Sequence, residues 1–160
     1  MITQQQVLDA FEYREGKLYW KYVKSIRIKA GEEAGREDAF GYRTVRFNYK
    51  MYRTHHLIYL MFHGVLPKII DHINGNRLDN RIENLRIATD SQNNCNKGIQ
   101  VNNTTGSKNV KWHERIKKYE VSVQVNKQRQ YIGVFEDLEL ADLVAHMARE
   151  KYHGNFAKHN

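Results

Sequence analysis

The chain has little cysteine, no long apolar run and no leader-like start. Its single cysteine, Cys95, excludes an intramolecular disulfide and a zinc site made of several cysteines, and it indicates a reducing compartment. No segment approaches the roughly 20 apolar residues of a membrane-spanning helix. Residues 1–6 lack the basic start and apolar run of a signal peptide. We therefore expect a soluble cytoplasmic protein with no membrane partner.

Acidic residues are also in deficit. The 160 residues include 18 Asp and Glu against 26 Lys and Arg, which gives a formal net charge of +8 and a pI near 9.5. This excess favours a polyanionic partner such as nucleic acid, although charge alone leaves the partner open. With 41% hydrophobic residues, the chain can form one ordinary domain or two small ones.

The first half of the chain predicts a small turn-rich sheet followed by a helix. A short helical pattern at 7–11 precedes two segments of strand composition, 17–20 and 42–47. Thr54 is a candidate N-cap for an apolar helix that Gly64 should end.

A strand, long loop, strand and helix should follow. The strands are predicted at 68–71 and 85–88, and the segment between them is polar. Thr89 and Gln92 have capping-box spacing, so a helix should begin there and end near Gly98.

The last third predicts a separate module. Residues 99–106 have few large apolar side chains, which indicates a linker. Three strands are predicted at 108–113, 119–125 and 129–135, and an amphipathic helix at 138–152.

Alternation in the middle strand separates two faces of this sheet. Val121, Val123 and Val125 should face the helix, which leaves an open face that includes Gln124. The open face is a candidate DNA-contacting surface, with a solvated surface as the alternative. Its candidate contact residues are mostly basic: Lys108, Lys111, Arg115, Lys117, Lys118, Gln124, Arg129 and Tyr131.

A second polar cluster carries a family resemblance. Asp71-His72, the flanking segment 73–76, Asn84-Leu85-Arg86 and Asn93 resemble the HNH nuclease family, in particular its phage and intron-borne homing endonucleases. The resemblance covers about 40–98, and the preceding His55-His56 pair is similar to the histidine-containing helix of such proteins.

The carboxy-terminal module resembles the AP2 DNA-binding domain. Residues 131–135, Ala141 and residues 154–157 carry this likeness, which covers about 107–157. The first strand lacks the full arginine-rich pattern of that family.

The HNH resemblance implies a ββα-metal fold and assigns roles. It implies that Asp71 and Asn93 bind one divalent cation, Mg²⁺ with Mn²⁺ as a substitute, that His72 is the general base and that Asn84 has a supporting catalytic role. Arg77, Arg81 and Arg86 surround this cluster and are candidate DNA phosphate contacts.

Simpler interpretations compete with these roles. An EF-hand is disfavoured, because Gly75 is the fifth residue from Asp71 and the third is Ile73. A lone histidine is usually structural, but His72 beside Asp71 favours catalysis. The roles of His55 and His56 stay open.

Together these patterns predict an α+β chain: an HNH region at 1–98, a linker at 99–106 and an AP2-like module at 107–160. The HNH region comprises a β-rich extension at 1–53 and a ββα-metal core at 54–98, and the module is a three-stranded antiparallel sheet with one helix.

The predicted function is metal-dependent cleavage of double-stranded DNA by a homing-type endonuclease, acting as a monomer or homodimer in the cytoplasm, the host's if the gene is a phage gene. The alternatives are a non-enzymatic DNA-binding regulator and an RNA-binding protein.

Overall fold

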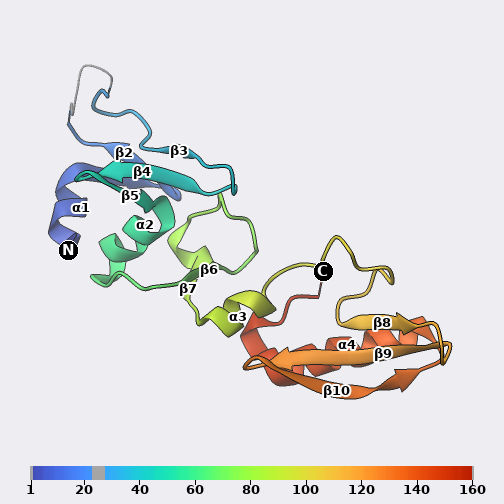
Figure 1. Cartoon of the computed structure of the whole chain (residues 1–160). Coiled ribbons are helices and arrows are strands. Elements are labelled where there is room, and N and C mark those ends of the chain that lie inside the picture. Colours follow the sequence, from blue (N-terminus) through green and yellow to red (C-terminus); the bar gives the residue numbers. More distant parts are fainter. Residues whose placement is uncertain (1, 23–27, 160) are drawn as a thin grey trace. The chain divides into compact units, whose positions relative to one another are not determined.

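The fold is described from a computed structural model, which covers residues 2–22 and 28–159. The chain divides into two compact units, Met1–Ile87 and Ala88–Asn160. Small antiparallel sheets and four α-helices make up the described part of the chain, so the expected α+β class is confirmed (Figure 1). Each unit is described by itself.

The first unit begins with helix α1 (Gln4–Ala10) and a hairpin of β1 (Phe11–Arg14) and β2 (Lys17–Trp20). Thr3 and Gln6 form a capping box that starts α1. The helix ends at Ala10 because the chain turns to extended backbone at Phe11, which pairs with Trp20 across the hairpin. The strand predicted at 17–20 is therefore confirmed.

A three-stranded sheet and the second helix complete the core of this unit. The sheet contains β3 (Arg36–Glu37), β4 (Arg43–Phe47) and β5 (Lys50–Arg53), and α2 (Thr54–His63) follows directly. The expected N-cap at Thr54 is wrong by one residue. Arg53, the last residue of β5, is the N-cap because its backbone stays extended. Phe11, Leu18, Phe47, Leu57 and Ile58 are among the residues that pack as one buried cluster.

Strands β6 (Ile70–His72) and β7 (Leu85–Ile87) form the hairpin that carries the HNH-like residues, with the short 3₁₀ helix η1 (Ile82–Asn84) before β7. The hairpin of β1 and β2 supports the long loop that connects β6 to β7. A side chain on Gly16 would come within 2.7 Å of the Arg81 backbone nitrogen, so the β1–β2 turn needs glycine there. The Ile82 N–H also donates to the Tyr13 hydroxyl, at 3.3 Å.

The second unit starts with α3 (Asp90–Cys95). Thr89 and Gln92 form the predicted capping box, but the helix ends at Cys95 rather than near Gly98. The unit begins at Ala88, so α3 groups with the carboxy-terminal module rather than with the hairpin. One reason is Lys108, whose Nζ donates to the carbonyls of Cys95 and Lys97 at 2.8 and 2.6 Å. The domain bounds expected at 98 and 107 stay a prediction.

The rest of the second unit is a sheet covered by one helix. Its order is β10 (Gln128–Phe135), β9 (Lys118–Val125) and β8 (Val110–His113), all antiparallel. Helix α4 (Leu138–His153) packs on β9 and is followed by the 3₁₀ helix η2 (Gly154–Phe156) (Figure 1).

The inward face of this sheet matches the predicted alternation. Val121 and Val123 are fully buried and Val125 is half-buried, and Val110, Val121, Ala141 and Ala145 form the core. The outward residues Lys111, Gln124 and Arg129 stay exposed.

No helix in the described ranges, 2–22 and 28–159, has the length and apolar character needed to cross a membrane.

Candidate active site

The candidate site is built on the β6–β7 hairpin. Asp71 lies opposite Arg86 in the strand register, and His72 lies opposite Leu85. Because successive side chains of a strand point to opposite faces, Asp71 and His72 project in opposite directions. Each is only 5% exposed. A buried carboxylate and a buried imidazole need polar partners, so those partners define the chemistry of the site.

Arg86 is the ionic partner of Asp71. Its Nη2 and Nε atoms lie 2.7 and 2.8 Å from Asp71 Oδ2. The Arg86 side chain is only 18% exposed, so the guanidinium balances a carboxylate that water barely reaches. The predicted contact of Arg86 with DNA phosphate stays a prediction, and in this structure its guanidinium is engaged with Asp71.

Asn80 is the polar partner of the His72 ring. His72 Nε2 lies 2.9 Å from Asn80 Oδ1, and Asn80 is 1% exposed. Because a carboxamide oxygen can only accept, a neutral His72 ring that is hydrogen-bonded to Asn80 Oδ1 carries its proton on Nε2 and its lone pair on Nδ1. Burial lowers the pKa of His72, and the contact with Asn80 partly opposes this shift. The ring is thereby kept in the neutral form that a general base requires.

Asn84 holds the loop between the two strands in place. Its Oδ1 accepts from the Asn74 backbone N–H at 3.0 Å, and its Nδ2 donates to Asn74 Oδ1 at 3.0 Å and to the Asp79 carbonyl at 2.7 Å. Asn84 is buried. The loop that contains Asn80, the partner of His72, is therefore fixed from inside by one side chain.

Asp79 and Asn74 extend this network to the surface. Asn74 Nδ2 donates to Asp79 Oδ2 at 2.8 Å, and Arg81 donates to the same carboxylate through Nε and Nη2, both at 2.8 Å. The bonds from Arg81 and Asn74 lower the pKa of Asp79 to about 2. Arg81 is half exposed, so its predicted phosphate contact would start from this surface pair.

His55 packs against the His72 ring. It lies in the first turn of α2, is 1% exposed, and its ring centroid is 4.8 Å from that of His72 in an edge-to-face arrangement. Burial, followed by the neighbouring His56 and His72, lowers the pKa of His55 to about 2. Its Nδ1 finds no hydrogen-bond partner among the described residues. The structure thus places a second neutral imidazole, that of His55, next to the candidate general base His72.

Two arginines surround an aromatic ring at the same place. The Arg53 and Arg77 guanidinium carbons lie 4.0 and 5.0 Å from the centroid of the Tyr42 ring, and that ring is 6.3 Å from the His72 ring. Cation–π contacts hold such guanidiniums in position without neutralising them. Arg77 also donates to the Phe40 carbonyl at 2.8 Å. Positive charge is therefore available beside His72 for a phosphate.

Asn93, the other expected metal ligand, lies on α3 in the second unit. Its side chain is half-buried, and its backbone N–H donates to the Thr89 carbonyl at 2.9 Å. Asp71, His72 and Asn84 all lie in the first unit. The ligand role of Asn93 stays a prediction.

A cleft of about 710 Å³ lies in the second unit, and four of the predicted DNA contacts line it: Lys108, Lys111, Gln124 and Arg129. Arg129 is paired with Glu120 and also donates to Ser122 Oγ at 3.0 Å. The lining is rich in amide and cationic groups, as a surface for a phosphate backbone needs to be.

Lys108 and the candidates outside the cleft lining differ in their surroundings. Lys108 is largely internal: its Nζ also donates to the Lys158 carbonyl at 3.0 Å, and burial lowers its pKa to about 8. Lys117 and Lys118 pair with nearby glutamates, while Arg115 and Tyr131 are exposed. A structural role explains the burial and the hydrogen bonds of Lys108, and its contact with DNA stays a prediction.

Sequence reasoning missed the contacts of Asn74, Asp79 and Asn80, and used Asn74 only as part of the motif segment 73–76. Each belongs to a loop with an unusual density of carboxamide and carboxylate side chains, which was the available signal. That density alone is equally typical of a solvated turn, because asparagine and aspartate favour turns. Only the buried hydrogen bonds distinguish the two cases.

Comparison with known proteins agrees with this location. The family of HNH endonucleases matches residues 52–95, which include α2, the β6–β7 hairpin and α3. The chain is also similar to Protein 3.8 of Escherichia phage T7, with 31% identity over 114 residues that cover 69% of this chain and 92% of the phage protein. No solved structure matches the chain.

Proposed function

Because this chain belongs to the HNH endonuclease family, we propose that it is a metal-dependent DNA endonuclease with His72 as its general base. The observation that carries the proposal is the buried His72–Asn80 pair beside Asp71. A neutral imidazole with a directed lone pair, next to a carboxylate, is suited to activating water.

Asp71 and Asn93 are the residues we propose to hold one divalent cation, Mg²⁺ or Mn²⁺ in its place. Their donor atoms, a carboxylate and a carboxamide oxygen, are those that hard cations prefer. Asp71 is already paired with the Arg86 guanidinium through Oδ2, so the cation would share this carboxylate with Arg86. When bound, the cation supplies Lewis-acid stabilisation of charge on the phosphate and the departing 3′ oxygen.

The remaining steps fall to side chains of the hairpin. His72 Nδ1 takes a proton from water as the water oxygen bonds to phosphorus and the bond to the 3′ oxygen breaks. Asn80 holds the ring in the required tautomer, and Asn84 holds the loop that carries Asn80. Arg77, whose guanidinium is kept in place by Tyr42, is suited to bind the phosphate.

A plasmid assay tests the activity. Supercoiled plasmid is expected to be nicked or linearised with Mg²⁺ and to stay intact with EDTA, and Asp71→Asn should slow cleavage by at least about 100-fold, the scale of losing metal stabilisation. Asp9→Asn, an exposed acid on α1, is the matched control and should cleave normally. Binding of DNA by the intact chain without cleavage, in both Mg²⁺ and Mn²⁺, would contradict the proposal.

We further propose that the second unit is an AP2-like DNA-binding module that supplies affinity for double-stranded DNA. Its three-stranded antiparallel sheet, covered on one face by α4, supports this assignment. A homing-type role, with cleavage at a chosen site, is the finer proposal and rests on the resemblance of the motif. One site per chain cuts one strand, so a monomer would nick DNA and a homodimer would cut both strands.

The salt dependence of binding tests this module. Lys111→Ala and Arg129→Ala are each expected to weaken duplex binding and to reduce the slope of log affinity against log salt by about 0.9 for each phosphate that is no longer neutralised. Both side chains are exposed on the outward face of the sheet, so folding should be unaffected. Lys151→Ala removes an exposed cation on α4 and is the control. Equal slopes for the intact chain and all three variants would show that DNA does not bind to the outward face of this sheet.

A further inference from the structure

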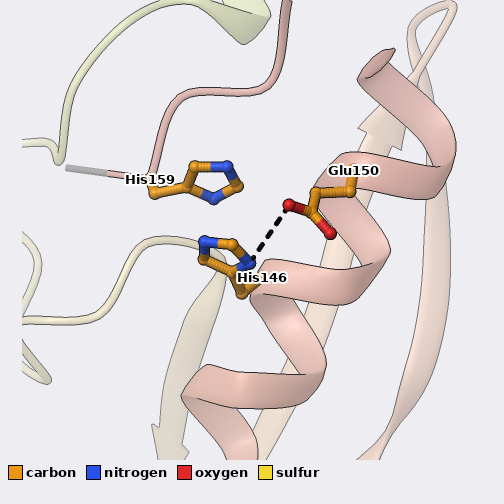
Figure 2. A group of neighbouring side chains, drawn as sticks. All are labelled: His146, Glu150 and His159. Carbon is orange, nitrogen blue, oxygen red and sulfur yellow. Dashed lines mark ion pairs between the residues drawn. The ribbon is translucent and has the colours of Figure 1, made fainter. Parts of the chain in front are cut away.

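Three side chains of metal-ligating type, none of them used above, meet in the second unit. His146 and Glu150 lie on α4 and His159 follows η2 (Figure 2). One ligand atom from each lies within 4.8 Å of the others. Among residues 2–22 and 28–159, this is the one such group of three histidine, cysteine, aspartate or glutamate side chains.

Local structure explains why these side chains meet. His146 and Glu150 are four residues apart on a helix and therefore share a face, with 3.7 Å between His146 Nδ1 and Glu150 Oε1. Gly154 has a positive φ of 51°, which ends α4 and lets the chain turn back. The His159 ring then stacks on the His146 ring, with 3.5 Å between centroids (Figure 2).

Hydrogen bonds hold this returning segment on the unit. The Lys158 carbonyl accepts from Lys108 Nζ at 3.0 Å, and Arg149 Nε donates to His159 Nδ1 at 3.3 Å. Arg149 is buried and its Nη1 donates to the Lys108 carbonyl at 2.6 Å. These contacts position His159 in the absence of a ligand. Because Nδ1 is the nitrogen that accepts from Arg149, a cation must displace this hydrogen bond to bind a neutral His159 ring.

The donor set indicates which cation would bind. Two imidazoles and one carboxylate are the ligands of a borderline transition metal such as Zn²⁺ and suit Mg²⁺ poorly. Two stacked imidazole rings repel each other if both are protonated. Burial, together with the neighbouring His146 and Arg149, lowers the pKa of His159. Arg149 adds a positive charge nearby, which reduces the affinity for a cation, and Glu150 offsets it.

We infer that His146, Glu150 and His159 form a second metal site, which prefers a borderline transition-metal cation such as Zn²⁺. Ligand atoms around a tetrahedral Zn²⁺ with bonds near 2.1 Å lie about 3.4 Å apart, so the group must contract and the stacked rings must turn. Water completes the coordination. The bound cation clamps the segment after η2 onto α4 and so stabilises the second unit.

Zn²⁺ titration of the full chain against a chromophoric chelator tests the inference. The titration uses an Asp71→Ala/His72→Ala background, which removes the proposed nuclease site, so failure of one site is distinguishable from failure of the other. One Zn²⁺ per chain is expected, with affinity at least tenfold weaker in His159→Ala and in Glu150→Gln. His63→Ala, an exposed histidine at the end of α2, is the matched control.

Two further readouts keep the test decisive. Glu150 is exposed and Glu150→Gln keeps its shape, so this variant should fold like its parent. Zn²⁺ should also slow amide hydrogen exchange of residues 154–159 in the parent and leave the exchange unchanged in His159→Ala. Equal stoichiometry and affinity in the parent, His159→Ala and Glu150→Gln, or exchange that Zn²⁺ does not alter, would overturn the inference.

Discussion

Replacing His72 with alanine is expected to slow DNA cleavage by about 10²- to 10⁴-fold, the range typical for loss of a general base. The reason is that alanine has no atom to replace Nδ1, which takes the proton from water. In the intact protein the contact between Nε2 and Asn80 Oδ1 holds the ring in the tautomer that has its lone pair on Nδ1. Cleavage of supercoiled plasmid under single-turnover conditions measures the effect. DNA affinity should change little, because His72 is buried and the proposed phosphate contacts are untouched.

Chemical rescue separates a base from a structural residue. His72→Ala leaves a space of imidazole size beside Asn80, so imidazole added to the buffer should restore part of the cleavage rate in this variant. The intact protein should not respond, and His63→Ala should cleave normally with or without imidazole. Full activity of His72→Ala would remove His72 from the mechanism, and loss of activity without rescue, in a folded variant, would argue for a structural role.

Replacing Asn84 with alanine is expected to destabilise the first unit by roughly 3 kcal/mol, because alanine cannot form the three partly buried hydrogen bonds, which contribute about 1 kcal/mol each. For a unit of this size the melting temperature should fall by about 12–24 °C. Thermal unfolding followed by circular dichroism measures this change. Cleavage should fall as well, at temperatures where the variant is folded, because the loop that carries Asn80 is no longer fixed.

Asn102→Ala is the control for this variant, since Asn102 is an exposed asparagine in the second unit. Its melting temperature should match that of the intact chain. Asn84→Asp keeps the acceptor for the Asn74 N–H but places a carboxylate oxygen against the Asn74 Oδ1 and Asp79 carbonyl acceptors, so it should be at least as unstable as Asn84→Ala. Asn84→Ala with unchanged stability and activity would show that the loop is held by other contacts.

The parts of the fold that follow from local sequence were predictable. The Thr89 capping box, the strand at 17–20 and the alternation around Val121 and Val123 depend on residues a few positions apart. Boundaries were less predictable. Helix α2 begins at Thr54 with Arg53 as its N-cap because a strand runs directly into it, and that depends on the pairing of β4 with β5.

The sequence also pointed to Asp71 and His72, whose roles in the site stay a prediction, but it did not give their contacts. The contact of Asp71 with Arg86 depends on the register of a hairpin closed by a long loop, and period-2 patterns do not give that register. The contact of His55 with His72 depends on how α2 packs on the hairpin. Both are tertiary effects, which no single segment of the sequence contains.

The hydrogen bonds of Asn74 have a consequence for how the protein ages. In an Asn-Gly sequence such as Asn74-Gly75, the glycine nitrogen can attack the asparagine carboxamide carbon and expel ammonia to form a succinimide. Water then opens this ring to isoaspartate, which lengthens the backbone, or to aspartate. Here both reacting groups are occupied. The Gly75 N–H donates to the His72 carbonyl at 2.8 Å, and the Asn74 carboxamide is bonded to Asn84 and Asp79. Deamidation therefore requires the loop to open first, so the folded hairpin protects its own covalent integrity, and the damage accumulates in chains that spend time unfolded.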